Sequence, residues 1–132
     1  MAATKWSDKS DSIVQPFVLT DESGSYLTNA TLYNSTALQS KQIVKTSPGT
    51  LYNVYGYNSG SAQYIHILNR SSSLNNGTAP SIVIRAAANS NFNYDGYLFG
   101  IPFTQGISIA NSTKAATLQT GSANCWFNVT YK

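Results

Sequence analysis

The sequence is poor in the residues on which most catalytic and metal sites depend. Charged residues make up 10% of its 132 positions, against roughly 25% in an average soluble domain. It contains one cysteine, Cys125, and one histidine, His66. A single cysteine excludes an internal disulfide and a cysteine zinc site, and a single histidine excludes a multi-histidine metal centre. The sequence therefore excludes a disulfide-stapled scaffold.

Long apolar runs are absent as well. No stretch approaches the roughly 18 apolar residues of a membrane span, and residues 1–11 (MAATKWSDKSD) lack the apolar segment of a secretory signal peptide. A chain of 132 residues and 14.2 kDa fits one domain and leaves no room for a second core. We therefore expect a single domain that does not act at a membrane.

The few residues that take part in catalysis in other proteins are dispersed here. A catalytic histidine needs a nucleophile and an orienting carboxylate within reach, but only Asp95 follows His66 as an acid, so we expect a hydrogen-bonded structural histidine. Cys125 is expected to be a small buried hydrophobe. Asp21 and Glu22 are adjacent and would point to opposite faces of a strand. We expect no enzymatic activity, no metal and no cofactor.

The residues that are plentiful indicate a folded domain with a polar, uncharged surface. Ser, Thr, Asn and Gln together account for 50 positions, and aromatic residues for 12% of the chain, more than a disordered chain carries. Short β-branched and aromatic segments alternate with Gly, Asn, Ser and Pro, which is typical of strands and turns. The expected strands cover residues 12–20, 30–35, 42–46, 50–57, 62–69, 81–87, 97–103, 107–110 and 124–131.

Three of these segments carry specific expectations. Residues 50–57 and 62–69 flank a four-residue loop that contains Gly60, which predicts a β-hairpin. Residues 81–87 (SIVIRAA) are apolar on both faces except at Arg85, which predicts a strand covered on both sides. Residues 124–131 (NCWFNVTY) alternate apolar and polar side chains, as in a strand with one buried face.

Regular short strands without a convincing helix favour a sandwich or a barrel. We predict an all-β fold, a two-sheet antiparallel sandwich that is jelly-roll-like, with about eight strands and an extended N-terminal arm. The arm covers residues 1–11, and residues 12–132 form the single β-sandwich domain. Trp6 is expected to anchor the arm on a partner, because a lone indole in a polar segment often docks on an apolar surface; packing of Trp6 on its own domain is the alternative.

Tyrosine is the most informative residue type for binding. Tyr52, Tyr55, Tyr57 and Tyr64 all lie in the predicted hairpin, and tyrosine is enriched at interfaces because it combines an apolar ring with a polar tip. Residues 50–57 place Tyr55 and Tyr57 on the same face as Leu51, and Tyr52 on the other. These four tyrosines, with Trp6, are the predicted interface residues, and filling of the core is the alternative role.

The basic residues do not indicate nucleic-acid binding. Residues 23–132 hold six lysines and arginines against Asp95 alone, but these six are scattered singly along the chain. Binding to phosphates grows with the number of clustered cationic contacts. We therefore expect no nucleic-acid partner.

Five segments resemble small virion proteins of tailed bacteriophages. They are residues 49–58 (GTLYNVYGYN), 62–67 (AQYIHI), 103–107 (FTQGI), 111–117 (NSTKAAT) and 125–129 (CWFNV). Proteins of this type include capsid decoration, or cement, proteins with jelly-roll folds. The resemblance covers roughly residues 49–131, carries no catalytic signature, and leaves residues 1–48 without a counterpart.

The resemblance implies a non-enzymatic decoration protein that binds and stabilises the outer surface of the phage head. Such a protein would be made in the bacterial host cytoplasm and reside on the capsid surface of the virion. Its expected partners are the major capsid protein and other copies of itself, as a homodimer or homotrimer, because few charges protect the edge strands. The alternative is a carbohydrate- or receptor-binding module of a phage tail or head fibre.

Overall fold

The computed structural model describes residues 30–96 and 99–132. The described residues form nine strands, and among them no helix is long and apolar enough to cross a membrane. The strands are β1 (Thr31–Asn34), β2 (Lys41–Lys45), β3 (Gly49–Asn58), β4 (Gln63–Leu68), β5 (Ile82–Ala86), β6 (Ser90–Asp95), β7 (Ile101–Phe103), β8 (Ile107–Ser112) and β9 (Cys125–Tyr131). The predicted arm of residues 1–11 and the predicted strand at 12–20 lie outside the described residues.

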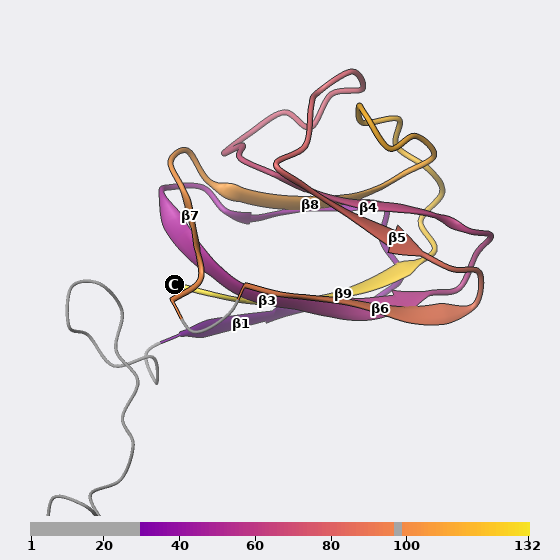
Figure 1. Ribbon diagram of the computed structural model, residues 1–132, viewed down its shortest axis with the longest axis horizontal. Helices are drawn as coiled ribbons and strands as arrows, with labels where there is room; N and C mark the ends of the chain where they lie inside the picture. The colour runs from indigo at the N-terminus through magenta and orange to yellow at the C-terminus, as the bar shows by residue number, and fades with distance from the viewer. Residues whose placement is uncertain (1–29, 97–98) are drawn as a thin grey trace, which may run out of the picture.

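The strands form two antiparallel sheets that pack face to face (Figure 1). The five-stranded sheet has the order β1-β9-β3-β6, with β7 beside β3, and the four-stranded sheet has the order β2-β8-β4-β5. Four pairs are nested along the chain: β1 with β9, β2 with β8, β3 with β6, and β4 with β5. Strands β1 to β9 thus form one long hairpin, which reverses direction between β4 and β5 and is folded over into the two sheets. This arrangement is a jelly roll, and the predicted two-sheet sandwich is confirmed.

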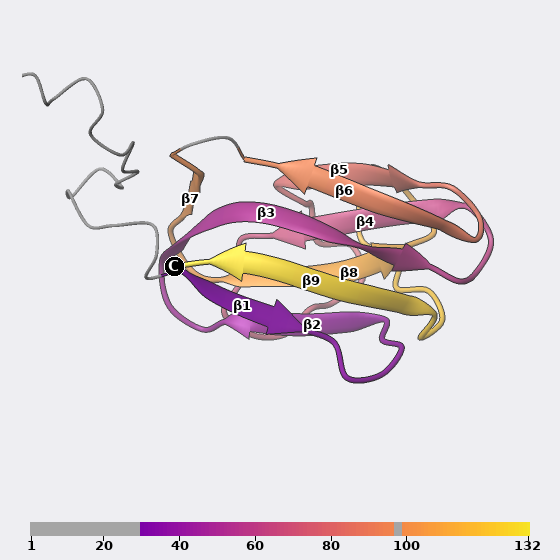
Figure 2. The ribbon, with the colours of Figure 1, turned by 90° about the horizontal axis from the view of Figure 1, so that it is seen from below.

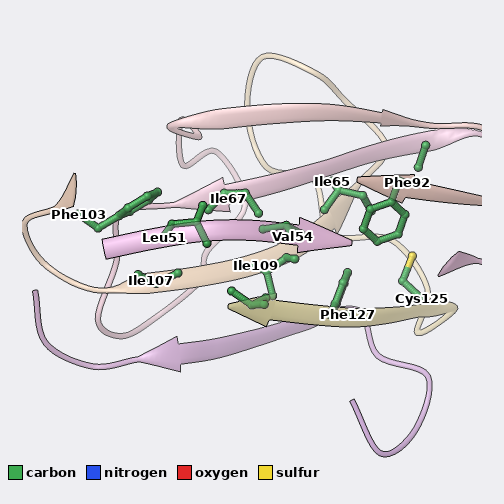
Figure 3. Packing of buried hydrophobic residues seen from close by; sticks show 12 residues of the cluster. Leu51, Val54, Ile65, Ile67, Phe92, Phe103, Ile107, Ile109, Cys125 and Phe127 are labelled. Carbon is green, nitrogen blue, oxygen red and sulfur yellow. The ribbon is translucent and has the colours of Figure 1, made fainter. Parts of the chain in front are cut away.

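Apolar side chains from both sheets fill the space between the layers (Figure 3). The largest is Phe127 of β9, which is fully buried and meets the ring of Phe92 edge-on, with 6.4 Å between the ring centroids. Along β9 the side chains alternate as predicted, since Phe127 and Val129 are buried and Trp126 is exposed. This alternation fixes which face of the five-stranded sheet is turned outward.

The predicted hairpin of residues 50–57 and 62–69 is wrong. Both segments are strands, but β3 pairs with β6, β7 and β9, whereas β4 pairs with β5 and β8 in the other sheet. The buried side chain of Asn58 holds the crossing between them, because its Nδ2 donates to the carbonyl oxygens of Ser61 (2.9 Å) and Ala87 (3.0 Å). The short loop therefore links two layers instead of closing a hairpin.

The prediction that residues 81–87 form a strand covered on both sides is also wrong. β5 is an edge strand, and its outward side chains Val83 and Arg85 are exposed. Its inward residues Ile82 and Ile84 pack against the core. A short apolar run does not distinguish a covered strand from an edge strand, because both have the same apolar pattern.

Candidate functional site

The outer face of the five-stranded sheet carries three aromatic rings and three asparagine amides, and we call it the aromatic–amide face. Its members are Tyr55, Tyr57, Asn91, Asn93, Trp126 and Asn128. They border a shallow hollow of about 490 Å³. Figure 2 shows the strands that carry them, β6, β3 and β9, side by side with β1.

The register of the strands sets these side chains in two rows. Tyr57 lies directly opposite Trp126 of β9 on one side and Asn91 of β6 on the other. Two positions earlier on β3, Tyr55 lies between the other two asparagines. The exposed fractions are 47% for Tyr55, 37% for Tyr57 and 38% for Trp126. Because these exposed rings lie side by side, this face is a candidate interaction site.

A β-bulge in β3 turns the tyrosines outward. The register with β9 pairs Leu51 with Tyr131 and Asn53 with Thr130, so Tyr52 is an extra residue on β3. The predicted faces of this strand are therefore wrong, because Leu51 points into the core with Val54 and not outward with the tyrosines. The bulge shifts the alternation by one residue.

The predicted interface tyrosines are separated by the fold. Tyr52 is 7% exposed and belongs to the buried residues, in line with the alternative role of filling the core. Tyr64 lies in the other sheet, half-buried, with the guanidinium of Arg85 over its ring at 5.9 Å from the centroid. Only Tyr55 and Tyr57 share a face, and Trp6 lies outside the described residues.

Trp126 and the asparagines of the face were missed by reasoning from the sequence. The alternation along residues 124–131 does place Trp126 on the polar side of its strand, and this was the available signal. Its neighbours, however, come from β3 and β6, which lie far from it in the sequence. The composition of the face depends on which strands pair.

The opposite side of the sandwich is closed by two long loops, residues 69–81 and 113–124. Both loops lie above β4 and β8 in Figure 1. Backbone hydrogen bonds connect them, from Gly77 N to Leu118 O (2.7 Å) and from Leu118 N to Thr78 O (2.8 Å). Beneath them, a second small apolar group consists of Leu68, Leu74, Ala110 and Leu118, with Ile43 against it. The loops cover the central part of the outer face of the four-stranded sheet.

This loop-covered side carries most of the positive charge of the described residues. Lys41 and Arg85 project outward from β2 and β5, while Arg70 and Lys114 lie in the two loops. Lys41 Nζ donates to Leu74 O at 3.4 Å, and Arg70 Nη2 donates to Ser73 O at 3.2 Å. The single described carboxylate, Asp95, lies on β6 of the other sheet. The two sides of the sandwich therefore differ in chemistry.

At one end of the core, buried amides form a hydrogen-bonded network around Cys125. Gln63 Nε2 donates to Asn58 Oδ1 and to Asn124 Oδ1, both at 2.8 Å, and Asn111 Nδ2 donates to Asn124 Oδ1 at 3.0 Å. Burial raises the pKa of the Cys125 thiol, which a side-chain hydrogen bond from Asn111 opposes. The thiol is therefore protonated near neutral pH, and nucleophilic chemistry needs the thiolate.

His66 is fully buried on the loop-covered side, and its surroundings differ from the expectation. Neither ring nitrogen makes a well-formed hydrogen bond to any described residue, so the expected hydrogen-bonded histidine is not found. Burial lowers the pKa of His66 below its ordinary 6.5, and the nearby backbone of Lys114 and Ala115 opposes this only in part.

The lowered pKa predicts a specific loss of stability in mild acid. The unfolded chain binds a proton at His66 more readily than the folded one, so stability falls as the pH falls below about 6.5. Replacing His66 with leucine should remove this part of the pH dependence, because an apolar side chain leaves no unpartnered nitrogen. Urea unfolding of both proteins at about pH 7.5 and about pH 5.5 measures the difference. An identical loss in both proteins would contradict the prediction.

Within residues 30–96 and 99–132, no three His, Cys, Asp or Glu side chains come together as a metal site would require. Comparison of the chain with protein-family models, curated proteins and solved structures finds no match. The candidate functional surfaces are the two outer sides of the sandwich.

Proposed function

We propose that the protein is a non-enzymatic structural protein of a tailed-bacteriophage virion, which binds the outer surface of the head and stabilises the shell. Two features support this proposal. The sequence resembles small phage virion proteins over roughly residues 49–131, and jelly rolls are common in viral capsid domains. The partner would be the major capsid protein.

The observation that carries the proposal is the difference between the two sides of the sandwich. A protein that decorates a shell needs one side that binds the shell and another that faces the medium. The loop-covered side offers Lys41, Arg70, Arg85 and Lys114 to an acidic surface, whereas the aromatic–amide face has no charged member. We assign the loop-covered side to the head and leave the aromatic–amide face exposed.

Many copies on a regular shell can bind it stably even though the contacts of each copy are weak. Exposed charge pairs are worth up to about 1 kcal/mol each, so a single copy would bind weakly. Linked contacts on a regular shell act at a high effective concentration, which raises the overall affinity without new contacts. Neighbouring copies would contact one another as homodimers or homotrimers. A cryo-electron microscopy reconstruction of the decorated head would show these contacts as well as the number of copies.

Binding to heads of the phage that encodes the protein tests the proposal. Purified protein should co-sediment with heads, and cryo-electron microscopy should show many copies in a regular array. The triple variant K41Q/R85Q/K114Q should bind about tenfold more weakly, from roughly 0.5 kcal/mol per lost charge, and binding of the unaltered protein should weaken with salt.

Trp126→Ala is the control, because it alters the other side and should leave binding to heads unchanged. Heads that bind no protein at low salt would contradict the proposal. So would a triple variant that binds as well as the unaltered protein.

A carbohydrate- or receptor-binding module of a phage tail or head fibre is the second candidate function. The exposed rings of Tyr55, Tyr57 and Trp126 favour it, since aromatic side chains dominate binding energy at interfaces. A few copies at a vertex or on the tail, instead of a regular array on the head, would support this candidate.

A further inference from the structure

The aromatic–amide face combines exposed rings with exposed asparagine amides. Asn91 and Asn93 are exposed and make no side-chain hydrogen bond to any described residue, while Asn128 Nδ2 reaches only the carbonyl oxygen of Tyr55, at 3.4 Å. We propose that this face is a binding site for an uncharged glycan. The inference goes beyond attachment to the head and gives the alternative of a carbohydrate-binding module a site and a ligand class; it applies whether the chain lies on the head or on a fibre.

The rings provide surfaces on which sugar rings can stack. A pyranose has an apolar face of C–H groups of about the size of an aromatic ring, and tyrosine and tryptophan offer a flat apolar face with a polar edge. Tyr57 and Trp126 are a direct cross-strand pair, whose Cβ atoms lie about 5 Å apart. Tyr55 follows two positions along β3. The three rings therefore support more than one sugar unit.

The amides provide the hydrogen bonds that stacking lacks. Each asparagine amide offers two donors and an acceptor, which matches neighbouring hydroxyl groups on a sugar. Asn91 lies opposite Tyr57, and Asn93 lies opposite Tyr55, so each of these tyrosines has an amide beside it on β6. A sugar stacked on either ring would find an amide at its edge.

The absence of charge among these side chains selects an uncharged ligand. Neither row contains a charged residue, and the carboxylate of Asp95 lies in the next row, opposite Asn53. An acidic sugar or a nucleic-acid phosphate would meet no cation within these rows. The cations Lys41, Arg85 and Lys114 lie on the opposite side of the sandwich.

Affinity electrophoresis through gels that contain a polysaccharide tests the inference. The neutral probes are dextran, mannan, galactan and hydroxyethyl cellulose, and the acidic probes are hyaluronan and polysialic acid. We expect at least one neutral polysaccharide to retard the protein, and neither acidic one. Trp126→Ala and Tyr57→Ala should each weaken binding by about tenfold or more, and the double variant N91A/N93A should weaken it several-fold.

Val83→Ala is the matched control, because Val83 is 42% exposed but lies on the other sheet. It should be retarded as strongly as the unaltered protein, and urea unfolding confirms that each variant is folded. The inference is overturned if no neutral polysaccharide retards the protein, if only the acidic ones do, or if Trp126→Ala binds unchanged.

Two further results would give the face another occupant and overturn the inference. A dimer that Trp126→Ala converts to a monomer in sedimentation would show that a second copy covers the face. Loss of head binding in Trp126→Ala or Tyr57→Ala would show that the capsid covers it. Failure of the proposed head attachment is a separate result, because that attachment depends on the cations of the loop-covered side.

Discussion

Replacing Phe127 with alanine should lower the free energy of unfolding by about 3–5 kcal/mol. Phe127 is fully buried between the sheets and packs edge-on against Phe92, so truncation would leave a cavity that paired strands on both sides cannot close. Since domains of this size are stable by only about 5–15 kcal/mol, the loss is a large share of the total. The midpoint of urea unfolding should fall while the slope of the transition is preserved.

Two variants make this prediction decisive. Phe127→Leu keeps most of the apolar volume and should lose less, which provides a measurable value if the alanine variant does not fold. Tyr55→Ala removes a ring of similar size from an exposed position on β3 and should cost far less than Phe127→Ala. Similar losses for the buried and the exposed ring would contradict the role of Phe127 in the core.

Replacing Gly56 with alanine should destabilise the protein by about 3 kcal/mol, the upper end of the range for overpacking. A Cβ at this position would collide with the backbone carbonyl oxygen of Trp126 and lie 2.6 Å from Cζ of Phe92. Gly56 pairs with Phe127 on β9 and with Phe92 on β6. The obstructing oxygen belongs to a paired strand, so it cannot move without disturbing the sheet.

Comparison of neighbouring positions on β3 tests this explanation. Chemical unfolding of Gly56→Ala should show the loss, and Gly56→Val should lose more because its side chain is larger. Tyr57→Ala, one position along with an outward side chain, should lose much less. A Gly56→Ala variant as stable as the unaltered protein would show that β9 can shift to accommodate the methyl group.

Local patterns in the sequence predicted the layered fold and every described strand except β6 (Ser90–Asp95), but not the pairing of the strands. The alternation around Phe127 and the short segments between turn residues follow from side-chain period and turn chemistry, which are local. The choice of partner for β3 depends on residues far along the chain, and the short loop after Asn58 gives no sign that it crosses between sheets. The predicted hairpin was wrong for this reason.

The binding surface was less predictable than the fold. A single bulge residue, Tyr52, reversed the expected faces of β3 around Leu51, and bulges leave no clear mark in one sequence. Tyr64 was grouped with Tyr55 and Tyr57 because all were assigned to one hairpin, and it lies in the other sheet. The burial of His66 results from the two loops that cover its sheet. The side-chain pattern of a strand gives no information about such loops, so the unpartnered nitrogens were not predicted.

The nested pairing of the jelly roll also imposes an order on folding. Ile67 pairs with Ile82 across a short stretch of chain, whereas Thr31 pairs with Tyr131 near the other end of the sequence. Because the entropy lost on closing a loop grows with its length, β4 and β5 can meet early, and β1 and β9 meet only after the strands between them are in place. Topologies dominated by such distant pairs fold slowly, in milliseconds to seconds. A newly made chain cannot close its roll until β9 has left the ribosome, and until then the apolar side chains of β3 and β4 are open to other chains.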